Sequence, residues 1–119
     1  MKFLSIYTPD ARTAATAHTK EHMAAMGKLM EESAKSGELV ATGGLLPISK
    51  GGAHVRSSGG KITVTDGPFA EAKELVAGWA ILQYNSREEA IEGVKRFIRV
   101  AGDGEVDLRQ IMDGPPEAA

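Results

Sequence analysis

The sequence contains no cysteine, which excludes disulfide bonds, a thiol nucleophile and metal sites built on thiolates. It has no apolar stretch near the ~20 residues that a membrane-spanning helix needs, and no signal-peptide core at its start. Lysine and arginine form no run and the net charge is −2, so we expect no direct binding to nucleic acid. No cofactor motif is present. We therefore expect a cytoplasmic protein that has no membrane segment and needs no cofactor.

A chain of 119 residues is long enough to bury the core of one domain. No internal repeat or low-complexity segment divides it. We therefore expect a single domain over residues 1–113. Residues 114–119 are small or polar and include two adjacent prolines, so they should form a flexible C-terminal tail.

Alternating apolar and β-branched residues predict four long strands and two short ones. The long strands cover residues 2–7, 38–45, 75–84 and 105–112, and the short ones cover residues 53–57 and 61–65. Gly59 and Gly60 can adopt the positive φ angles of a tight turn, so the short strands should form a hairpin. Residues 8–10 should end the first strand. In the second long strand, Gly43 and Gly44 mark either a bulge or a close backbone approach.

Two amphipathic helices are expected, each with a recognisable start. Thr19 is placed to cap the first helix, and Gly37 is placed to end it in the left-handed conformation. Ser86 and Glu89 form a capping box for the second helix. Residues 11–18 are either a short helical turn or a loop. The apolar face of the first helix should carry Met23, Met26, Leu29, Met30 and Ala34.

This order of elements is strand, helix, strand, then a hairpin, then strand, helix, strand. Two helices over one mainly antiparallel sheet form a ferredoxin-like α+β domain. The helices can cover only one face of the sheet, yet residues 75–84 are apolar on both sides. Since most soluble oligomers are symmetric homodimers, a second copy is the simplest cover for the other face. The sequence therefore predicts a homodimer with sheet-to-sheet contact.

The turn Asp66-Gly67-Pro68-Phe69 is the best candidate for a functional site. Proline fixes its own φ and restricts the preceding glycine, so the turn is rigid, with a carboxylate at its entrance and an aromatic ring at its exit. Asp66 is the candidate acid or base, and Gly67, Pro68 and Phe69 are candidate ligand contacts. The alternative is a turn that only ends a strand, in which Asp66 caps backbone N–H groups.

Three further side chains are candidates for binding a ligand. Arg56 and Arg109 are the cations placed to hold an anionic ligand, since their strand neighbours should point inward. The alternative is an ion pair with Asp107 or Glu105. Trp79 either packs in the dimer contact or lines a pocket.

His18 and His22 formally match the H-x-x-E-H pattern of some zinc proteases. The pattern straddles the predicted start of a helix, whereas a metal site needs both histidines on one helical face. We therefore predict two solvated histidines and no metal site.

Residues 59–74 carry a Gly-Gly turn followed by Thr-Asp-Gly-Pro-Phe-Ala-Glu, and this run resembles the signature of the DGPF branch of the YCII-related family. That branch usually continues with Thr-Lys-Glu, where this chain has Ala72. The likeness extends on both sides, from the first strand to residue 112, except for residues 8–18. Further matching segments are residues 25–28, 44–47, 55–56, 76–79, 89–91 and 107–109.

The resemblance implies a dimeric α+β barrel and no particular reaction. A His–Asp pair in a cleft is suggested as catalytic in the broader family, but its positions fall near Met26 and Ser49 here, and neither is an acid or a base at neutral pH. Members of the DGPF branch are often associated with extracytoplasmic-function sigma factors.

Two functions are therefore compatible with the sequence. The first is binding or transformation of a small molecule in a cleft between the first long helix, the sheet and the Asp66 turn. The second is a non-catalytic accessory or regulatory module with a protein partner linked to a sigma factor. The residues do not decide whether the protein is an enzyme.

Overall fold

The computed structural model describes residues 1–46, 50–66 and 78–114. The strands are β1 (Lys2–Pro9), β2 (Leu39–Gly44), β3 (Ala53–Ser58), β4 (Lys61–Asp66), β5 (Gly78–Gln83) and β6 (Gly104–Gln110). The helices are α1 (Ala11–Thr16), α2 (Lys20–Ser36) and α3 (Arg87–Ala101). In this described part of the chain, no helix has the length and apolar character needed to cross a membrane.

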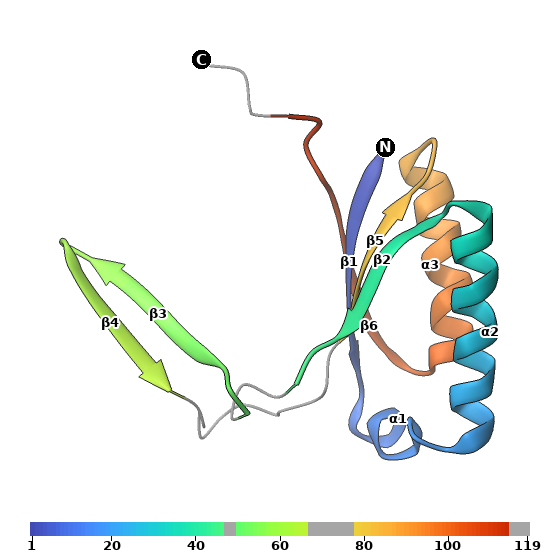
Figure 1. The fold of residues 1–119 in the computed structure, drawn as a ribbon, viewed down its shortest axis with the longest axis horizontal. Coiled ribbons are helices and arrows are strands. Elements are labelled where there is room, and N and C mark those ends of the chain that lie inside the picture. Colours follow the sequence, from blue (N-terminus) through green and yellow to red (C-terminus); the bar gives the residue numbers. More distant parts are fainter. Residues whose placement is uncertain (47–49, 67–77, 115–119) are drawn as a thin grey trace.

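Four strands form one sheet in the order β2-β5-β1-β6, and every neighbouring pair is antiparallel. β3 and β4 pair with each other in a separate two-stranded sheet. Both α2 and α3 lie on one face of the larger sheet (Figure 1). Without the hairpin, the order β1-α2-β2-β5-α3-β6 has the ferredoxin-like topology, so the predicted α+β fold class is confirmed.

The sheet has one face covered by helices and one face that the described chain leaves open. Side chains alternate along β1, so Ser5 and Tyr7 point toward the helices together with their partners Ala80 and Gly78 on β5. The centre of the open face carries Leu4, Ile6, Trp79 and Ile81, which are only half-buried. Burial of both faces of β5 stays a prediction, since Trp79 and Ile81 on the open face are half-buried in the single chain, and the predicted strand residues 75–77 lie outside the described residues.

The predicted helix ends are confirmed in detail. The Thr19 hydroxyl accepts a hydrogen bond from the backbone N–H of His22 at 3.2 Å, and Gly37 closes α2 with a φ of 84°. The Ser86 hydroxyl accepts from the N–H of Glu89 at 3.1 Å at the start of α3. Local side-chain chemistry therefore sets these three helix ends.

The segment after the first strand differs from the prediction. β1 continues through Thr8 and Pro9, which pair with β6, so the expectation that residues 8–10 end the strand is wrong. Proline is tolerated there because the pairing of β1 with β5 ends at Tyr7. The nitrogen of Pro9, which carries no hydrogen, therefore faces no described strand that would need a donor. Residues 11–18 resolve into the short helix α1, whose cap is Asp10.

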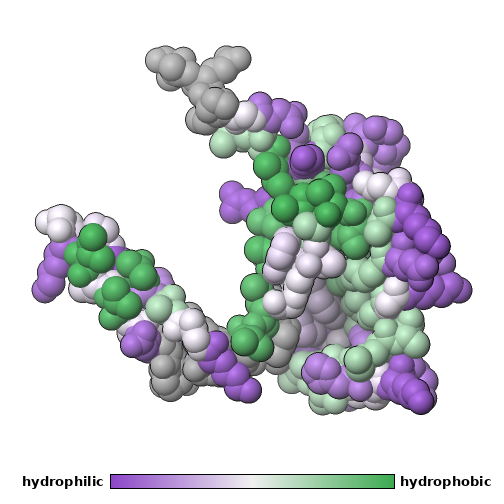
Figure 2. Space-filling model, viewed as in Figure 1, coloured by the Kyte–Doolittle hydropathy of each residue, from purple (hydrophilic) through white to green (hydrophobic). Residues whose placement is uncertain are grey.

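The hairpin forms as predicted and extends away from the larger sheet (Figure 1). Gly59 and Gly60 turn the chain with φ angles of 58° and 81°. Every residue of β3 and β4 is exposed, and Val55, Ile62 and Val64 share one face of the ribbon. Hydrophobic residues thus gather on the hairpin and along the side of the body that faces it (Figure 2).

The irregularity in β2 lies at a different residue from the predicted one. The pairing of β2 with β5 shifts between Leu39 and Ala41, so the bulge is at Val40 and not at Gly43 or Gly44. The alternative prediction, a close approach of another backbone, is not what the structure shows at Gly43, because a side chain approaches it instead. A side chain there would place its Cβ 2.9 Å from Nε1 of Trp79, because the indole ring lies against this glycine.

Candidate functional site

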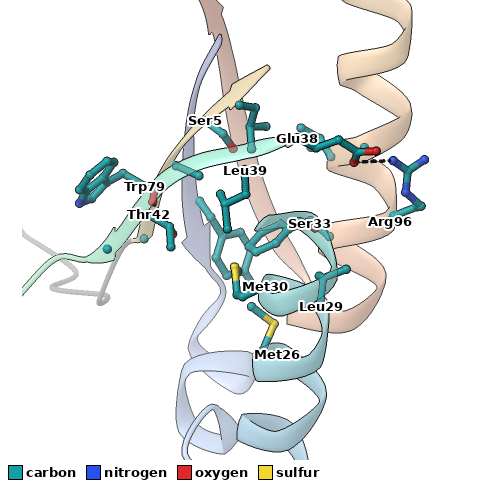
Figure 3. A pocket seen from close by; sticks show the side chains of 18 of the residues that line it. Ser5, Met26, Leu29, Met30, Ser33, Glu38, Leu39, Thr42, Trp79 and Arg96 are labelled. Carbon is teal, nitrogen blue, oxygen red and sulfur yellow. Dashed lines mark hydrogen bonds and ion pairs between the residues drawn. The ribbon is translucent and has the colours of Figure 1, made fainter. Parts of the chain in front are cut away.

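A cavity of about 210 Å³ lies between α2, α3 and the covered face of the sheet (Figure 3). It has a floor on β1, β2 and β5, a roof on α2, and a polar rim where β2 and the end of β5 meet α3. Its wall residues come from segments as distant in sequence as β1 and α3, so only the folded chain forms it.

The centre of the cavity floor is made of small residues, with Leu39, Leu82 and Tyr7 around them. Ser5 on β1 pairs with Ala80 on β5, and the next helix-facing position on β5 is Gly78. A packed core would place branched or aromatic side chains at these positions, because interiors are filled to crystal-like density. These short side chains leave an empty space between the sheet and α2.

The roof consists of long, flexible side chains from α2. The side chains of Met26, Leu29, Met30 and Ser33 line the cavity, and no residue of α2 is fully buried. Methionine suits such a surface because its unbranched thioether adapts to different shapes. The predicted face is thus partly wrong, since Met23 is 58% exposed and Ala34 is exposed as well.

Three polar side chains meet at the rim. The Tyr84 hydroxyl donates to Oε2 of Glu38 at 3.0 Å, and Nη2 of Arg96 lies 3.3 Å from the same oxygen. Burial, followed by the hydrogen bond to Glu38, raises the pKa of Tyr84 to about 12. Tyr84 therefore remains a neutral donor at physiological pH, and the charges of Glu38 and Arg96 offset each other.

Gly93 allows this cluster to form. It is a buried glycine in the middle of α3, where glycine is normally unfavourable by about 1 kcal/mol relative to alanine. A Cβ at this position would overlap the Tyr84 hydroxyl. The absence of a side chain therefore lets Tyr84 lie against the helix and reach Glu38.

The cavity suits a small, neutral and mainly apolar molecule. Most of its wall is hydrocarbon or thioether, and its charged pair is internally matched. Within residues 1–46, 50–66 and 78–114, no group of three or more His, Asp or Glu side chains is placed to hold a metal ion. Thr19, the cap of α2, stands between His18 and His22, so the two histidines do not share one helix, as expected.

The structure places Asp66 at the end of β4, opposite Ala53, where it is exposed. It shares a face with Ile62 and Val64, but these side chains are 69% and 63% exposed and so do not enclose the carboxylate. Asp66 does not line the cavity. Its role as acid, base or cap stays a prediction, and Gly67, Pro68 and Phe69 lie outside the described residues.

The remaining predicted residues do not gather at the cavity. Arg56 lies on the opposite face of the hairpin from Asp66, and the expectation that its strand neighbours point inward is wrong, because the whole strand is exposed. Arg109 is exposed on the open face of β6, where the described residues show no ion pair between it and Asp107. The ring of Trp79 lies on the open face, away from α2, although this residue also borders the cavity (Figure 3).

The sequence predicted a cleft between the first long helix and the sheet, but it placed Asp66 there and missed α3 and most of the residues that line the cavity. The available signal was a run of small residues at alternate positions of two paired central strands, Ser5 opposite Ala80 and then Gly78. Pairing of these strands has to be known before the small residues can be recognised as one surface.

Solved structures and a family model both match this chain. A divalent cation tolerance protein from Thermus thermophilus is 7% identical in sequence with a TM-score of 0.46, covering 97% of this chain and 88% of that chain. No curated protein sequence matches this chain. The family model of the YCII-related domain matches residues 1–114, and the chain therefore belongs to the YCII-related domain family.

Proposed function

We propose that this YCII-related domain binds a small, largely apolar molecule in the cavity between α2, α3 and the sheet. The observation that carries the proposal is the hollow of about 210 Å³ over a floor of small residues. An engineered apolar cavity of roughly 150 Å³ binds benzene, so this one has room for roughly eight to ten non-hydrogen atoms. An unfilled cavity of this size would destabilise the fold, and a ligand would offset that loss.

The family resemblance supports the same location. It places the histidine of the suggested His–Asp pair near Met26, and Met26 lines the cavity. We assign this chain to the DGPF branch. Methionine cannot transfer protons, so this chain lacks the His–Asp pair, and its cavity is suited to binding a molecule rather than to the chemistry of that pair. Any acid–base step would need another group, for which Asp66 remains the candidate.

The binding proposal is tested by filling the floor. Ala80→Ile adds a branched side chain at the centre of the cavity, and Ala53→Ile makes the same change at an exposed position of β3. We expect a panel of small neutral metabolites to raise the melting temperature of the wild type and of Ala53→Ile, because ligands that bind the native state stabilise it. Ala80→Ile should lose the shift. Equal shifts in all three proteins would show that the ligands bind elsewhere.

Asp66 is tested separately by Asp66→Asn, which removes the charge and keeps the shape. If Asp66 takes part in binding or turnover, the variant loses that activity while its unfolding curve is unchanged. If Asp66 is a cap, only the free energy of unfolding falls, by about 1 kcal/mol.

We further propose that the chain works as a cytoplasmic homodimer joined through the open sheet face. Leu4, Ile6, Trp79 and Ile81 form an apolar centre, and β6 contributes a charged edge beside it, as is common for protein interfaces. That edge carries both signs, Asp107 and Arg109, so a two-fold axis can pair each charge with its opposite on the second copy. A clean monomer in size-exclusion chromatography at micromolar concentration would contradict the homodimer.

The hairpin favours a second candidate function, the accessory role linked to extracytoplasmic-function sigma factors. Val55, Ile62 and Val64 are 63%, 69% and 63% exposed on one face of a ribbon that extends from the body. Exposed apolar residues gathered in this way are typical of protein-binding surfaces. Purified sigma factor should bind the wild type and should not bind Ile62→Thr/Val64→Thr. Ala80→Ile, which leaves the hairpin intact, should still bind the sigma factor.

A further inference from the structure

Ser5 is the one buried polar residue in the described part of the chain, with a relative exposure of 6%. It lies in the middle of β1, between β5 and β6, and its side chain faces the cavity. Its backbone is part of the sheet ladders, but its hydroxyl makes no hydrogen bond or other polar contact with a described residue. Figure 3 shows it on the sheet side of the cavity, opposite the α2 roof.

A hydroxyl without a partner is unfavourable at such a position. Burial removes its hydrogen bonds to water, and an alanine or valine would fill the same place in a sheet without that loss. The few buried polar groups that lack a partner in folded proteins call for a specific explanation. Here the hydroxyl faces a cavity, so a molecule inside the cavity can supply the missing partner.

The surroundings of Ser5 limit what that molecule can be. Its partner on β5 is Ala80, and the roof above is formed by methionine and leucine side chains, so the hydroxyl is a single polar point in an apolar region. Tyr84, Glu38 and Arg96 bond to one another at the rim, and the Tyr7 and Thr42 hydroxyls donate to backbone carbonyls. Among the described residues of the wall, Ser5 therefore offers the buried hydroxyl without a partner, the half-buried Ser33 hydroxyl of the roof lacks one as well, and no charge is unmatched.

We propose that Ser5 Oγ anchors the one polar group of the ligand, which is a neutral monocyclic alcohol, phenol or ketone. The proposal rests on the proposed binding function and assigns a ligand class to the same cavity. The hydroxyl can donate to a carbonyl oxygen or exchange a hydrogen bond with a hydroxyl group. The hydrocarbon ring fills the space below the roof, and roughly eight to ten non-hydrogen atoms set the upper size.

The test compares two probes of nearly equal shape, p-cresol and p-xylene, which differ by a hydroxyl in place of a methyl group. Their dissociation constants are measured by calorimetry or ligand-observed NMR with wild type, Ser5→Ala and Ser57→Ala. In Ser5→Ala the p-cresol constant should rise about 3- to 10-fold, as expected for a lost hydrogen bond, while the p-xylene constant should stay the same or fall. Ser57→Ala, at an exposed serine of β3 outside the cavity, should change both constants less than about 2-fold.

Thermal unfolding without a ligand gives an independent readout. Ser5→Ala should melt at the same or a higher temperature, because it removes a buried hydroxyl that lacks a partner. A clearly lower melting temperature would mean that the Ser5 hydroxyl already makes a hydrogen bond within the protein. This would contradict the proposal that Ser5 anchors the ligand.

The two proposals can fail separately. If both probes bind the wild type and Ser5→Ala leaves their ratio unchanged, the cavity binds small molecules and Ser5 is not the anchor. If neither probe binds the wild type, both the anchor and the binding of small apolar molecules in this cavity are overturned.

Discussion

The two long helices lie on the same face of the same sheet, yet only one of them is packed onto it. α3 buries Ala90, Gly93 and Ala101, whereas α2 buries no residue completely. Both helices have a proper cap and an amphipathic sequence, so the difference does not arise from helix formation itself. It arises from what each helix meets on the sheet.

Beneath α3, an aromatic ring of the sheet meets an aromatic ring of the helix. The ring of Tyr7 meets Phe97 edge-on at 5.2 Å, and the Tyr7 hydroxyl donates to the Gly102 carbonyl at 2.8 Å. Beneath α2 the described residues form no such pair, because methionine and leucine on the helix face serine, glycine and alanine at the centre of the cavity floor. The part of the domain beneath α3, the packed half, is tightly packed and stabilises the fold. The part beneath α2 contains the cavity, which lowers the stability.

The largest expected effect comes from the packed half. Phe3 is 1% exposed and is the largest fully buried side chain in the described residues, so Phe3→Ala should lower the free energy of unfolding by about 3–5 kcal/mol. Leu29→Ala, on the wall of the cavity, should lower it by only about 1 kcal/mol, because Leu29 is half-buried beside empty space. Urea titration of both variants measures the difference. Similar losses would mean that α2 is packed as tightly as α3.

Local structure was more predictable than the packing between helices and sheet. The caps at Thr19 and Ser86 and the turn at Gly59 depend on residues within three positions in sequence, so local chemistry determines them. The order of helices and strands then leaves few arrangements for the sheet. The ferredoxin-like topology could therefore be predicted with no knowledge of side-chain packing.

The cavity could not be predicted in the same way. It depends on the distance between two layers, and on Ser5 and Ala80 becoming neighbours although 75 positions separate them in sequence. Alternation on β5 shows two faces but does not show which of them faces α2. Asp66 was predicted as a site residue because a rigid turn follows it in the sequence. The described structure places it on an exposed ribbon. A local motif can show that a turn is rigid, but a binding site also needs several side chains that lie close together in space.

A glycine in each helix gives a matched test of the packing difference. Gly93 in α3 leaves no room for a Cβ because of the Tyr84 hydroxyl, while a Cβ at Gly27 in α2 has nothing within 4 Å. Gly93→Ala should therefore destabilise the protein by about 1–3 kcal/mol through overpacking. Gly27→Ala should stabilise it by roughly 0.5–1 kcal/mol through helix propensity alone. Both values are measured as free energies of unfolding in urea.

Tyr84→Phe provides the control for Gly93. It removes the oxygen that the new Cβ would overlap, so the double variant Gly93→Ala/Tyr84→Phe should recover part of the loss caused by Gly93→Ala. If the double variant loses the sum of the two single losses, the clash with Tyr84 is not the cause.

The smallest expected effect concerns the rim between the two halves and appears only at high pH. Burial and the hydrogen bond to Glu38 raise the pKa of Tyr84 from 10.0 to about 12, so the folded chain holds this proton more tightly than the unfolded chain. The resulting stabilisation is complete below pH 10 and is lost as the pH rises from 10 to about 12. Burial also raises the pKa of Tyr7, which packs against α3.

Absorbance of the phenolate measures this directly, since the chain has two tyrosines. In the wild type both should ionise above pH 10, and Tyr84→Phe should leave only the Tyr7 step. The drop in stability between pH 10 and 12 should be smaller in Tyr84→Phe than in the wild type. A Tyr84 step centred at pH 10 would show that water reaches the rim freely, and the cavity would then have no closed polar end.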